Sequence, residues 1–421
     1  MKVLIKQATV VSPSSPFNGK IKDILIDNGV IAKIADSISD DKATLVQQQG
    51  LHVSIGWMDI FSHFCDPGFE YRETLESGAN AAAAGGFTDV MVLPNTNPAL
   101  HNKSQVEYIV QKAKSLPVNI YPVGAVTKNT EGNELAEMYD MKESGAVAFS
   151  DGINAIQNSG LMIKALQYVK TFDGVIIQIP DDKSIAANGL MNEGIVSTQL
   201  GLPGKPMMAE ELIVARDIKL ARYADSRLHF TGVSSAKSLE YIKRAKEGGI
   251  KISCSVTPYH LFFTDEDLRT YDTNLKVNPP LRDKTNQAAL LTALLDGTVD
   301  CIASHHIPQN YDNKVCEFEY AKNGMIGLES LFGAVWSMVN DQWSMVQLIE
   351  RLTVSPRKIF GLSVPVIEEK AVACLTLFNP DAEYIFDEKM IVSKSKNSAF
   401  VGKQLKGKVM GIINGGKTYF N

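Results

Sequence analysis

Short apolar runs alternate with longer amphipathic segments through the middle of the chain. The first run ends at residues 61–63, and later runs occupy residues 87–94, 119–126, 146–151, 174–180, 228–234, 251–258 and 301–306. Between them lie segments with helical spacing of apolar residues, such as 73–86, 104–116, 209–224 and 236–249. Strands that alternate with helices build parallel sheets, so this pattern predicts an α/β fold, a (β/α)8 TIM-type barrel. A doubly wound open sheet is the alternative, but it requires a glycine-rich phosphate loop after the first strand, and the sequence has none there.

The two ends of the chain have a different pattern. Residues 1–53 and 363–421 contain short β-branched runs broken by turn residues, and Gly415–Gly416 is typical of a hairpin. Neither segment is long enough for a core of its own. We therefore expect both ends to pair into one small β-sandwich domain, with the barrel domain at residues 54–362.

The composition is that of a globular protein, with 45% hydrophobic and 21% charged residues. A net charge of −5 gives no reason to expect nucleic acid or an anionic membrane as a partner. The five cysteines are widely spaced without a C-x-x-C pair, which is typical of reduced thiols and indicates a cytoplasmic protein. We interpret the apolar start of the chain as a strand rather than a signal peptide, and no apolar run is long enough to span a membrane.

Several side chains that can carry chemistry follow the predicted strands, where the active sites of such barrels lie. These side chains are His63, Asn95, Asp151, Gln178 and His305. Each also has an ordinary structural interpretation, as a packed histidine, an Asx turn or a helix cap. Because side chains alternate along a strand, only one of His305 and His306 should face the barrel interior. By the same alternation, His229 packs behind the barrel if Gly232 faces inward.

Longer motifs carry a family resemblance. Residues 54–98 read SIGWMDIFSHFCDPGFEYRETLESGANAAAAGGFTDVMVLPNTNP. Further motifs follow in order: GAVAFSDG (145–152), GLMNEG (189–194), SVTPYHL (255–261), KVNPPLRD (276–283), NGMIGLES (323–330) and the segment 393–409. Over nearly the whole chain they resemble the long, multidomain bacterial dihydroorotases of the amidohydrolase superfamily. The resemblance implies an amidohydrolase barrel with a β-sandwich from both ends and zinc as the family's cofactor. It also implies the family's reaction in pyrimidine biosynthesis, which interconverts dihydroorotate and N-carbamoyl-aspartate.

The resemblance also assigns the family's site residues, and many of them are replaced. The retained positions are the metal-binding His63 and Asp151 and the substrate-binding Asn95 and Asn278. Metal-binding histidines of the family are replaced by Phe61, Gln178 and Gly232, and its general-base aspartate by His305. Cys65 and Gln309 stand where the family holds the substrate carboxylate. Phenylalanine and glycine offer no metal donor, so we expect no metal ion or at most one.

Two functions remain open. The first is a catalytically impaired or inactive dihydroorotase homologue that acts as a structural partner of aspartate carbamoyltransferase, as the resemblance to inactive members of the family implies. The family also implies a homo-oligomer such as a dimer. The alternative is an active cyclic-amide hydrolase, either with His63, Asp151 and His305 as a single-metal set or with His305 as a metal-free base.

Two further expectations follow from the histidines. Ordinary dihydroorotase activity is disfavoured, because it requires more histidines in the lumen than this chain offers. Only His63 and His305 are expected to face the lumen. If the site holds no metal ion, we expect the buried Asp151 to form a hydrogen bond or ion pair with His63 or His305, since an unpaired buried carboxylate is costly.

Overall fold

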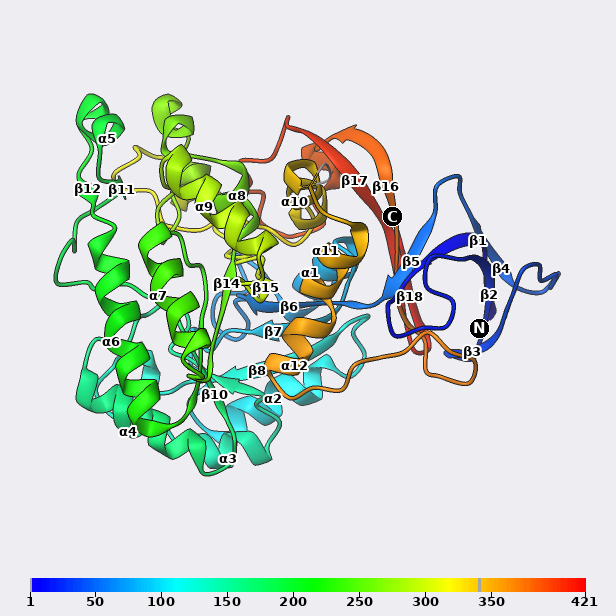
Figure 1. Cartoon of the computed structure of the whole chain (residues 1–421), viewed down its shortest axis with the longest axis horizontal. Helices are drawn as coiled ribbons and strands as arrows, with labels where there is room; N and C mark the ends of the chain where they lie inside the picture. Colours follow the sequence, from blue (N-terminus) through cyan, green and yellow to red (C-terminus); the bar gives the residue numbers. More distant parts are fainter. Residues whose placement is uncertain (1, 340–341) are drawn as a thin grey trace.

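The computed structural model describes residues 2–339 and 342–421, and it contains two large sheets that lie next to each other (Figure 1). One is a parallel barrel surrounded by helices. The other is a mixed sheet built from both ends of the chain, and both termini lie in this part of the molecule (Figure 1). The predicted (β/α)8 TIM-type barrel with a small β-rich part from both chain ends is confirmed.

The barrel strands follow one another in chain order, each paired in parallel with the next. They are β6 (Trp57–Ser62), β7 (Phe87–Val92), β8 (Asn119–Gly124), β9 (Ala148–Phe149), β10 (Val175–Gln178), β13 (Arg227–Phe230), β14 (Ile252–Val256) and β15 (Cys301–Ile302). Beyond β15, the backbone N–H of His63 donates to the carbonyl of His306 at 2.8 Å. This contact joins the last strand segment to the first, so the barrel is nearly closed.

The helices of the described residues mostly cover the outside of the barrel, while α5 among them projects from it (Figure 1). They are α1 (Leu75–Ala84), α2 (Lys103–Ala113), α3 (Met138–Glu143), α4 (Ser159–Lys170), α5 (Ile195–Leu200), α6 (Met208–Ala224), α7 (Ala236–Glu247), α8 (Pro258–Phe262), α9 (Lys284–Leu295), α10 (Leu331–Val339), α11 (Met345–Leu352) and α12 (Val354–Ile359). Shorter 3₁₀ turns are η1 (Lys128–Thr130), η2 (Asp265–Thr270), η3 (Thr273–Leu275), η4 (Tyr311–Asn313) and η5 (Glu388–Met390). Thr74 caps α1 in a capping box with Ser77, which fixes where the first helix begins. None of the helices in the described ranges is long and apolar enough to cross a membrane.

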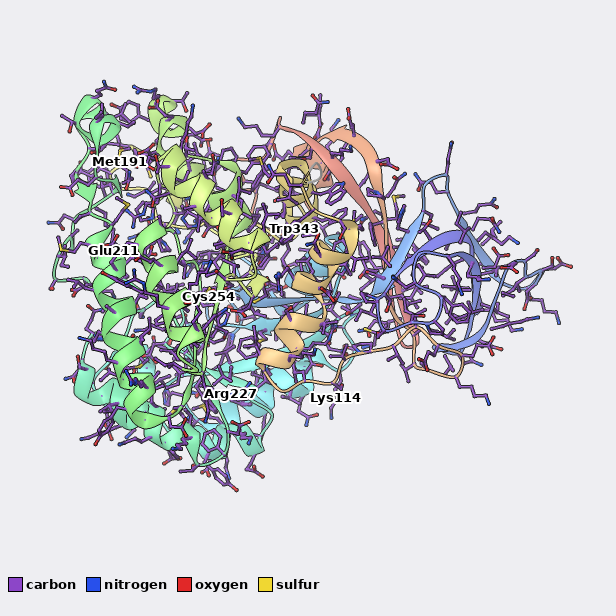
Figure 2. The ribbon with its side chains drawn as sticks, in the orientation of Figure 1. Lys114, Met191, Glu211, Arg227, Cys254 and Trp343 are labelled. Atoms are coloured by element: carbon purple, nitrogen blue, oxygen red, sulfur yellow. The ribbon has the colours of Figure 1, made fainter. Side chains whose placement is uncertain are left out.

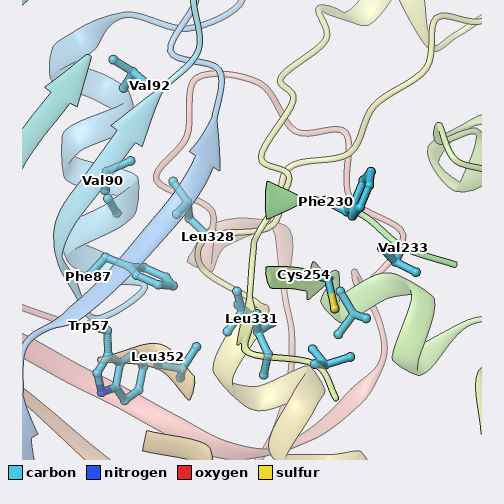
Figure 3. Packing of buried hydrophobic residues seen from close by; sticks show 14 of the residues in the cluster. Trp57, Phe87, Val90, Val92, Phe230, Val233, Cys254, Leu328, Leu331 and Leu352 are labelled. Carbon is cyan, nitrogen blue, oxygen red and sulfur yellow. The ribbon is translucent and has the colours of Figure 1, made fainter. Parts of the chain in front are cut away.

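The outer face of the strands packs against these helices through apolar side chains. Figure 3 shows part of this layer, with Trp57, Phe87 and Val90 on one side and Phe230 and Cys254 on the other. Burial of this layer supplies the main force that holds the helices on the barrel.

The inner face forms a second apolar cluster with a polar column beside it. Met58, Ile177 and Cys301 belong to the inner cluster. His229 pairs in register with Ile177, so it also points inward, and the prediction that it packs behind the barrel is wrong. The alternation of side chains along a strand does not extend from His229 to Gly232. The strand β13 ends at Phe230, and Gly232 has a left-handed backbone with φ of +69°.

The polar column runs along the barrel axis. The ring of His229 lies 2.8 Å from the hydroxyl of Ser253 and 3.1 Å from that of Ser255. Ser255 donates to the Thr231 hydroxyl at 2.9 Å, and Thr231 lies 2.8 Å from Nε2 of His305. The lumen is thus filled with packed side chains, as in other barrels of this kind.

The terminal sheet joins the two ends of the chain through β5 and β16, which pair antiparallel. Its strands are β1 (Lys2–Val11), β2 (Ile21–Asp27), β3 (Val30–Ala35), β4 (Thr44–Gln47), β5 (His52–Ile55), β16 (Cys374–Ile385), β17 (Gln404–Asn414) and β18 (Lys417–Phe420). A separate short pair, β11 (Met191–Asn192) and β12 (Gly204–Lys205), projects with α5 from the barrel (Figure 1).

A buried ion pair fastens the last helix to the barrel. Arg357 of α12 is buried and bonds to Asp89 of β7. We expect Arg357→Ala to lower the free energy of unfolding by about 3–5 kcal/mol, because Asp89 keeps a buried charge without its partner. Urea denaturation measures this loss. The control is Arg244→Ala, which removes an exposed pair with Glu240 and should cost little, because solvent screens exposed ion pairs. Equal losses in the two variants would contradict the importance of the Arg357 pair.

Candidate functional site

A cavity of about 240 Å³ opens at the carboxyl ends of the barrel strands. Figure 2 shows the two ends of the barrel. Arg227 lies at the start of β13, and Met191, in the projecting β11, lies at the opposite end. The cavity is lined by His63, Phe69, Arg72, Asn95, Ile153, Ile179, Tyr259, Val277, Asn278, Ile307, Gln309, Asn323 and Gly324. It therefore lies where barrels of this kind carry their chemistry.

Both ring nitrogens of His63 are engaged within the chain. Nε2 lies 2.9 Å from the backbone carbonyl of Asn95, so it carries the proton and donates. Nδ1 accepts from the backbone N–H of Cys65 at 3.0 Å and lies 2.9 Å from the Cys65 sulfur. Burial lowers the pKa of His63 to about 4, so the ring is neutral at physiological pH.

Cys65 and His63 form a close thiol–imidazole pair, but their surroundings oppose nucleophilic chemistry. Burial raises the pKa of Cys65 to about 12, while the pKa of His63 is lowered. A reactive cysteine needs the opposite shifts, because the thiolate is the nucleophile. The Cys65 side chain is buried beside His63 and is not among the residues that line the cavity.

Asp151 is buried and bonded to a single residue of a neighbouring loop. Its two oxygens accept from the backbone N–H of Thr127 at 2.8 Å and from the Thr127 hydroxyl at 2.5 Å. The expectation that His63 or His305 would be its partner is wrong, because Thr127 supplies two donors from the loop that follows β8. Burial raises the pKa of Asp151 to about 6.

His305 lies beneath the cavity and is fully buried. Its ring stacks on Phe61, with centroids 4.3 Å apart and planes inclined by 26°; we call this pair the Phe61–His305 stack. A Cβ atom added at Gly232 would lie 2.7 Å from Cε1 of His305, so the stack needs a residue without a side chain there. Burial holds the pKa of His305 well below its usual range.

The two glutamines that the family resemblance singled out, Gln178 and Gln309, bind other parts of the chain. Gln178 bonds to both backbone groups of Ile156 and donates to Asp217 of α6 at 3.2 Å, so it anchors a helix. Gln309 lines the cavity, and its Nε2 donates to the carbonyl of Asn323 at 2.9 Å.

The two candidate substrate-binding asparagines both line the cavity and are also bonded to the protein. Asn95 accepts from the N–H of Ile153 at 3.0 Å and donates to the carbonyl of Asp151 at 2.9 Å. Asn278 accepts from Lys205 at 2.9 Å and donates to Asp181 at 3.1 Å. The structure thus brings His63, Asn95, Asn278 and Gln309 to one cavity, while the remaining predicted positions lie outside its lining.

Sequence reasoning missed Arg72, Tyr259 and Asn323 as lining residues. Arg72 lies in the loop between β6 and α1, and the path of a loop leaves no periodic signal in the sequence. The aromatic residues Phe69 and Tyr71 beside Arg72 are the one local hint, since arginine often stacks on such rings.

The barrel, the sheet from both chain ends and the cavity at the strand ends define a protein of the amidohydrolase class. The L-hydantoinase of Arthrobacter aurescens matches this fold with a TM-score of 0.83 at 23% identity, covering 99% of this chain and 95% of that chain. A dihydropyrimidinase from Brevibacillus agri matches with a TM-score of 0.81 at 21% identity, covering 100% and 95%.

Sequence comparison narrows the class to a family. A family model described as dihydro-orotase-like matches residues 52–238. The dihydroorotase of Syntrophus aciditrophicus is 40% identical over 100% of this chain and 99% of its own length. That of Pelotomaculum thermopropionicum is 42% identical over 99% and 98%. The chain belongs to the dihydroorotase family of pyrimidine biosynthesis, which confirms the family resemblance.

The family uses zinc, which proteins hold with His nitrogens, Cys sulfurs and carboxylate oxygens, usually four in all with any bound water. Across residues 2–339 and 342–421, no group of three or more His, Cys, Asp or Glu side chains is placed to hold a metal ion. The set of His63, Asp151 and His305 that the sequence suggested for a single metal stays a prediction. Each of the three is bonded to a different neighbour, and as placed they do not fit zinc.

The close approach of Gly232 to His305 can be measured. We expect Gly232→Ala to cost clearly more than the ~1–2 kcal/mol of left-handed strain, because the new Cβ meets a fully buried ring. Gly249→Ala is the matched control, since Gly249 has φ of +75° with open space around it. Removing the ring with His305→Ala should make the two changes less than additive in chemical denaturation. Additive losses would contradict the contact.

Buried neutral histidines make stability depend on pH. Burial lowers the pKa of His63 to about 4 and those of His229 and His260 to about 3, and it lowers that of His305 strongly. Below the unfolded value of about 6.5, the unfolded chain therefore binds more protons. The free energy of unfolding should fall by up to about 1.4 kcal/mol per pH unit for each ring, from pH ~6.5 to ~4.

Denaturation at a series of pH values measures this slope. Burial raises the pKa of five carboxyls of the described residues, and these oppose the slope because the folded state binds a proton at each of them first: Asp59, Asp151, Asp217, Asp265 and Glu329. His305→Phe should reduce the slope by about one ring's share. The comparison of the two proteins isolates one ring, so the same slope in both would contradict the neutral burial of His305.

Proposed function

We propose that this chain is a non-catalytic member of the dihydroorotase family that acts as a structural partner of aspartate carbamoyltransferase. The observation that carries the proposal is the Phe61–His305 stack against Gly232. Residues at three functional positions of the family pack here against one another, and they fill the space at the barrel mouth with rings. A phenyl ring offers no metal donor, and the metal-bound hydroxide that attacks a cyclic amide needs a place to form.

The retained polar residues support the same proposal. The lone pair of His63 accepts a backbone N–H, and Asp151 is bonded to Thr127. His305, at the general-base position, is fully buried with a strongly lowered pKa. A general base has to reach its substrate and be basic near the working pH, and His305 meets neither condition.

The partnership rests on the resemblance to inactive family members and on surface at the barrel mouth. The chain matches two of its relatives over 99% and 98% of their own length, so it has the scaffold that they share. In the loop that follows β15, Tyr311 is 74% and Tyr320 is 70% exposed. Tyrosine side chains are enriched at protein interfaces, so this loop is suited to bind a partner. A homo-oligomer and at most one bound metal ion remain part of the proposal.

The test uses the purified full chain supplied with zinc. We expect no dihydroorotate hydrolysis above the uncatalysed rate, and a complex with the aspartate carbamoyltransferase of the same organism in size-exclusion chromatography with light scattering. Tyr311→Ala with Tyr320→Ala should weaken the complex. The control Tyr223→Ala removes a tyrosine of α6 that is also 74% exposed and should leave it unchanged.

Two results would overturn the proposal. Turnover of dihydroorotate, or of another cyclic amide with loss of activity in His63→Ala, would establish the alternative of an active hydrolase with a rebuilt site. Absence of any complex at micromolar concentrations would remove the structural role.

A further inference from the structure

A second cavity, of about 270 Å³, lies where the barrel meets the terminal sheet. Its walls come from both parts of the molecule. Ala84 ends α1 and Glu329 precedes α10, while Tyr384 lies on β16 and Lys408 on β17, which runs beside α10 in Figure 1. No described residue lines both this cavity and the one at the strand ends. We call it the junction cavity, and it is a site of its own.

Glu329 brings a carboxylate to the junction cavity. Its Oε1 accepts from the backbone N–H groups of Val392 at 3.1 Å and Ser393 at 2.9 Å, so the group is fixed in position. No cationic side chain of residues 2–339 and 342–421 forms an ion pair with it. Burial raises the pKa of Glu329, because the charged form is only partly compensated inside the protein. A positive charge brought into the cavity would stabilise the carboxylate.

Lys389 and Lys408 bring positive charge to the same cavity. The Nζ of Lys408 lies 5.9 Å from the centroid of the Tyr384 ring, and the aromatic face attracts the ammonium group. Within the part of the chain that the structure describes, neither lysine forms an ion pair with Glu329 or with another carboxylate. The cavity therefore has a negative group and two positive groups that do not neutralise one another.

Much of the remaining wall is apolar, with the side chains of Phe386, Met390, Val392 and Val409. The volume is near the lower end of small-molecule sites, which suits one small compound. A compound with a single charge would leave the opposite group of the cavity desolvated without a partner, which is costly. The end of a peptide chain also carries only one charge. A free zwitterion with an apolar body matches all three features of the cavity.

We propose that the junction cavity binds a free amino acid with an apolar side chain. The ammonium group of the ligand binds to Glu329, its carboxylate binds to Lys389 and Lys408, and its side chain packs on the apolar walls. Hydrogen bonds between charged groups are about twice as strong as those between neutral groups. Because the walls belong to the barrel and to the terminal sheet, the bound ligand joins these two parts. This inference goes beyond the proposed function and does not depend on it.

The experiment uses three probes with the same branched carbon chain. L-Leucine carries both charges, 3-methylbutylamine carries only the ammonium group, and 4-methylpentanoate carries only the carboxylate. Isothermal titration of the full chain should give at least about tenfold tighter binding of leucine than of either analogue, since a hydrogen bond to a charged group contributes that much. Leucine should also raise the unfolding temperature, because a ligand of the folded state stabilises that state.

Two variants assign the charges. Glu329→Gln keeps an acceptor for the two backbone N–H groups and removes the negative charge, so it should abolish the preference for leucine over 4-methylpentanoate. Lys389→Gln combined with Lys408→Gln should abolish the preference for leucine over 3-methylbutylamine. The control Lys403→Gln removes an exposed lysine that directly precedes β17 and is not among the lining residues, and it should leave all three affinities unchanged.

No binding of leucine up to about 10 mM, or equal binding of the three probes, would overturn the inference. Unchanged preferences in both charge variants would overturn it as well. The three probes on the unaltered chain decide the question by themselves if a variant fails to fold, which circular dichroism detects. A preference for leucine that each charge variant loses in turn supports the inference.

Discussion

The packing of one aromatic ring on another determines what the mouth of this barrel can contain. Phe61 and His305 come from opposite ends of the barrel sequence, and their stack leaves room beside it only for a glycine at position 232. Interiors are packed closely enough that a change of one side chain forces its neighbours to change. The three residues are therefore best understood as one unit, because Phe61 and Gly232 both approach the ring of His305 closely.

The remainder of the scaffold does not depend on a metal ion. The barrel is joined by strand pairing and by the contact between His63 and His306. The outer helices are held by the apolar layer around Trp57 and Phe87, and α12 is held by the pair between Arg357 and Asp89. The strand pairing, the apolar layer and the ion pair that hold this fold together are therefore separate from the side chains that line the cavity.

Sequence alone predicted the barrel and the β-rich part from both ends, because hydrophobic periodicity and the order of the motifs are local properties. It also directed attention to the strand ends, where His63 and Asn95 do line a cavity. It failed for His229, where a left-handed glycine ends the alternation, and for the partner of Asp151, which comes from a neighbouring loop. Arg72 was missed because its place at the cavity depends on the path of a loop. Contacts between distant segments are fixed by tertiary packing, which no spacing rule contains.

The polar column inside the barrel couples groups that lie far apart in the sequence. Ser255 donates to Thr231, which leaves the hydroxyl proton of Thr231 available for Nε2 of His305. Both ring nitrogens of His229 lie within hydrogen-bond distance of serine hydroxyls, those of Ser253 and Ser255. Nδ1 of His305 has no partner among the described residues. Because a hydroxyl can donate to one neighbour and accept from another, the proton positions along this row depend on one another, from Ser253 to the ring stacked on Phe61.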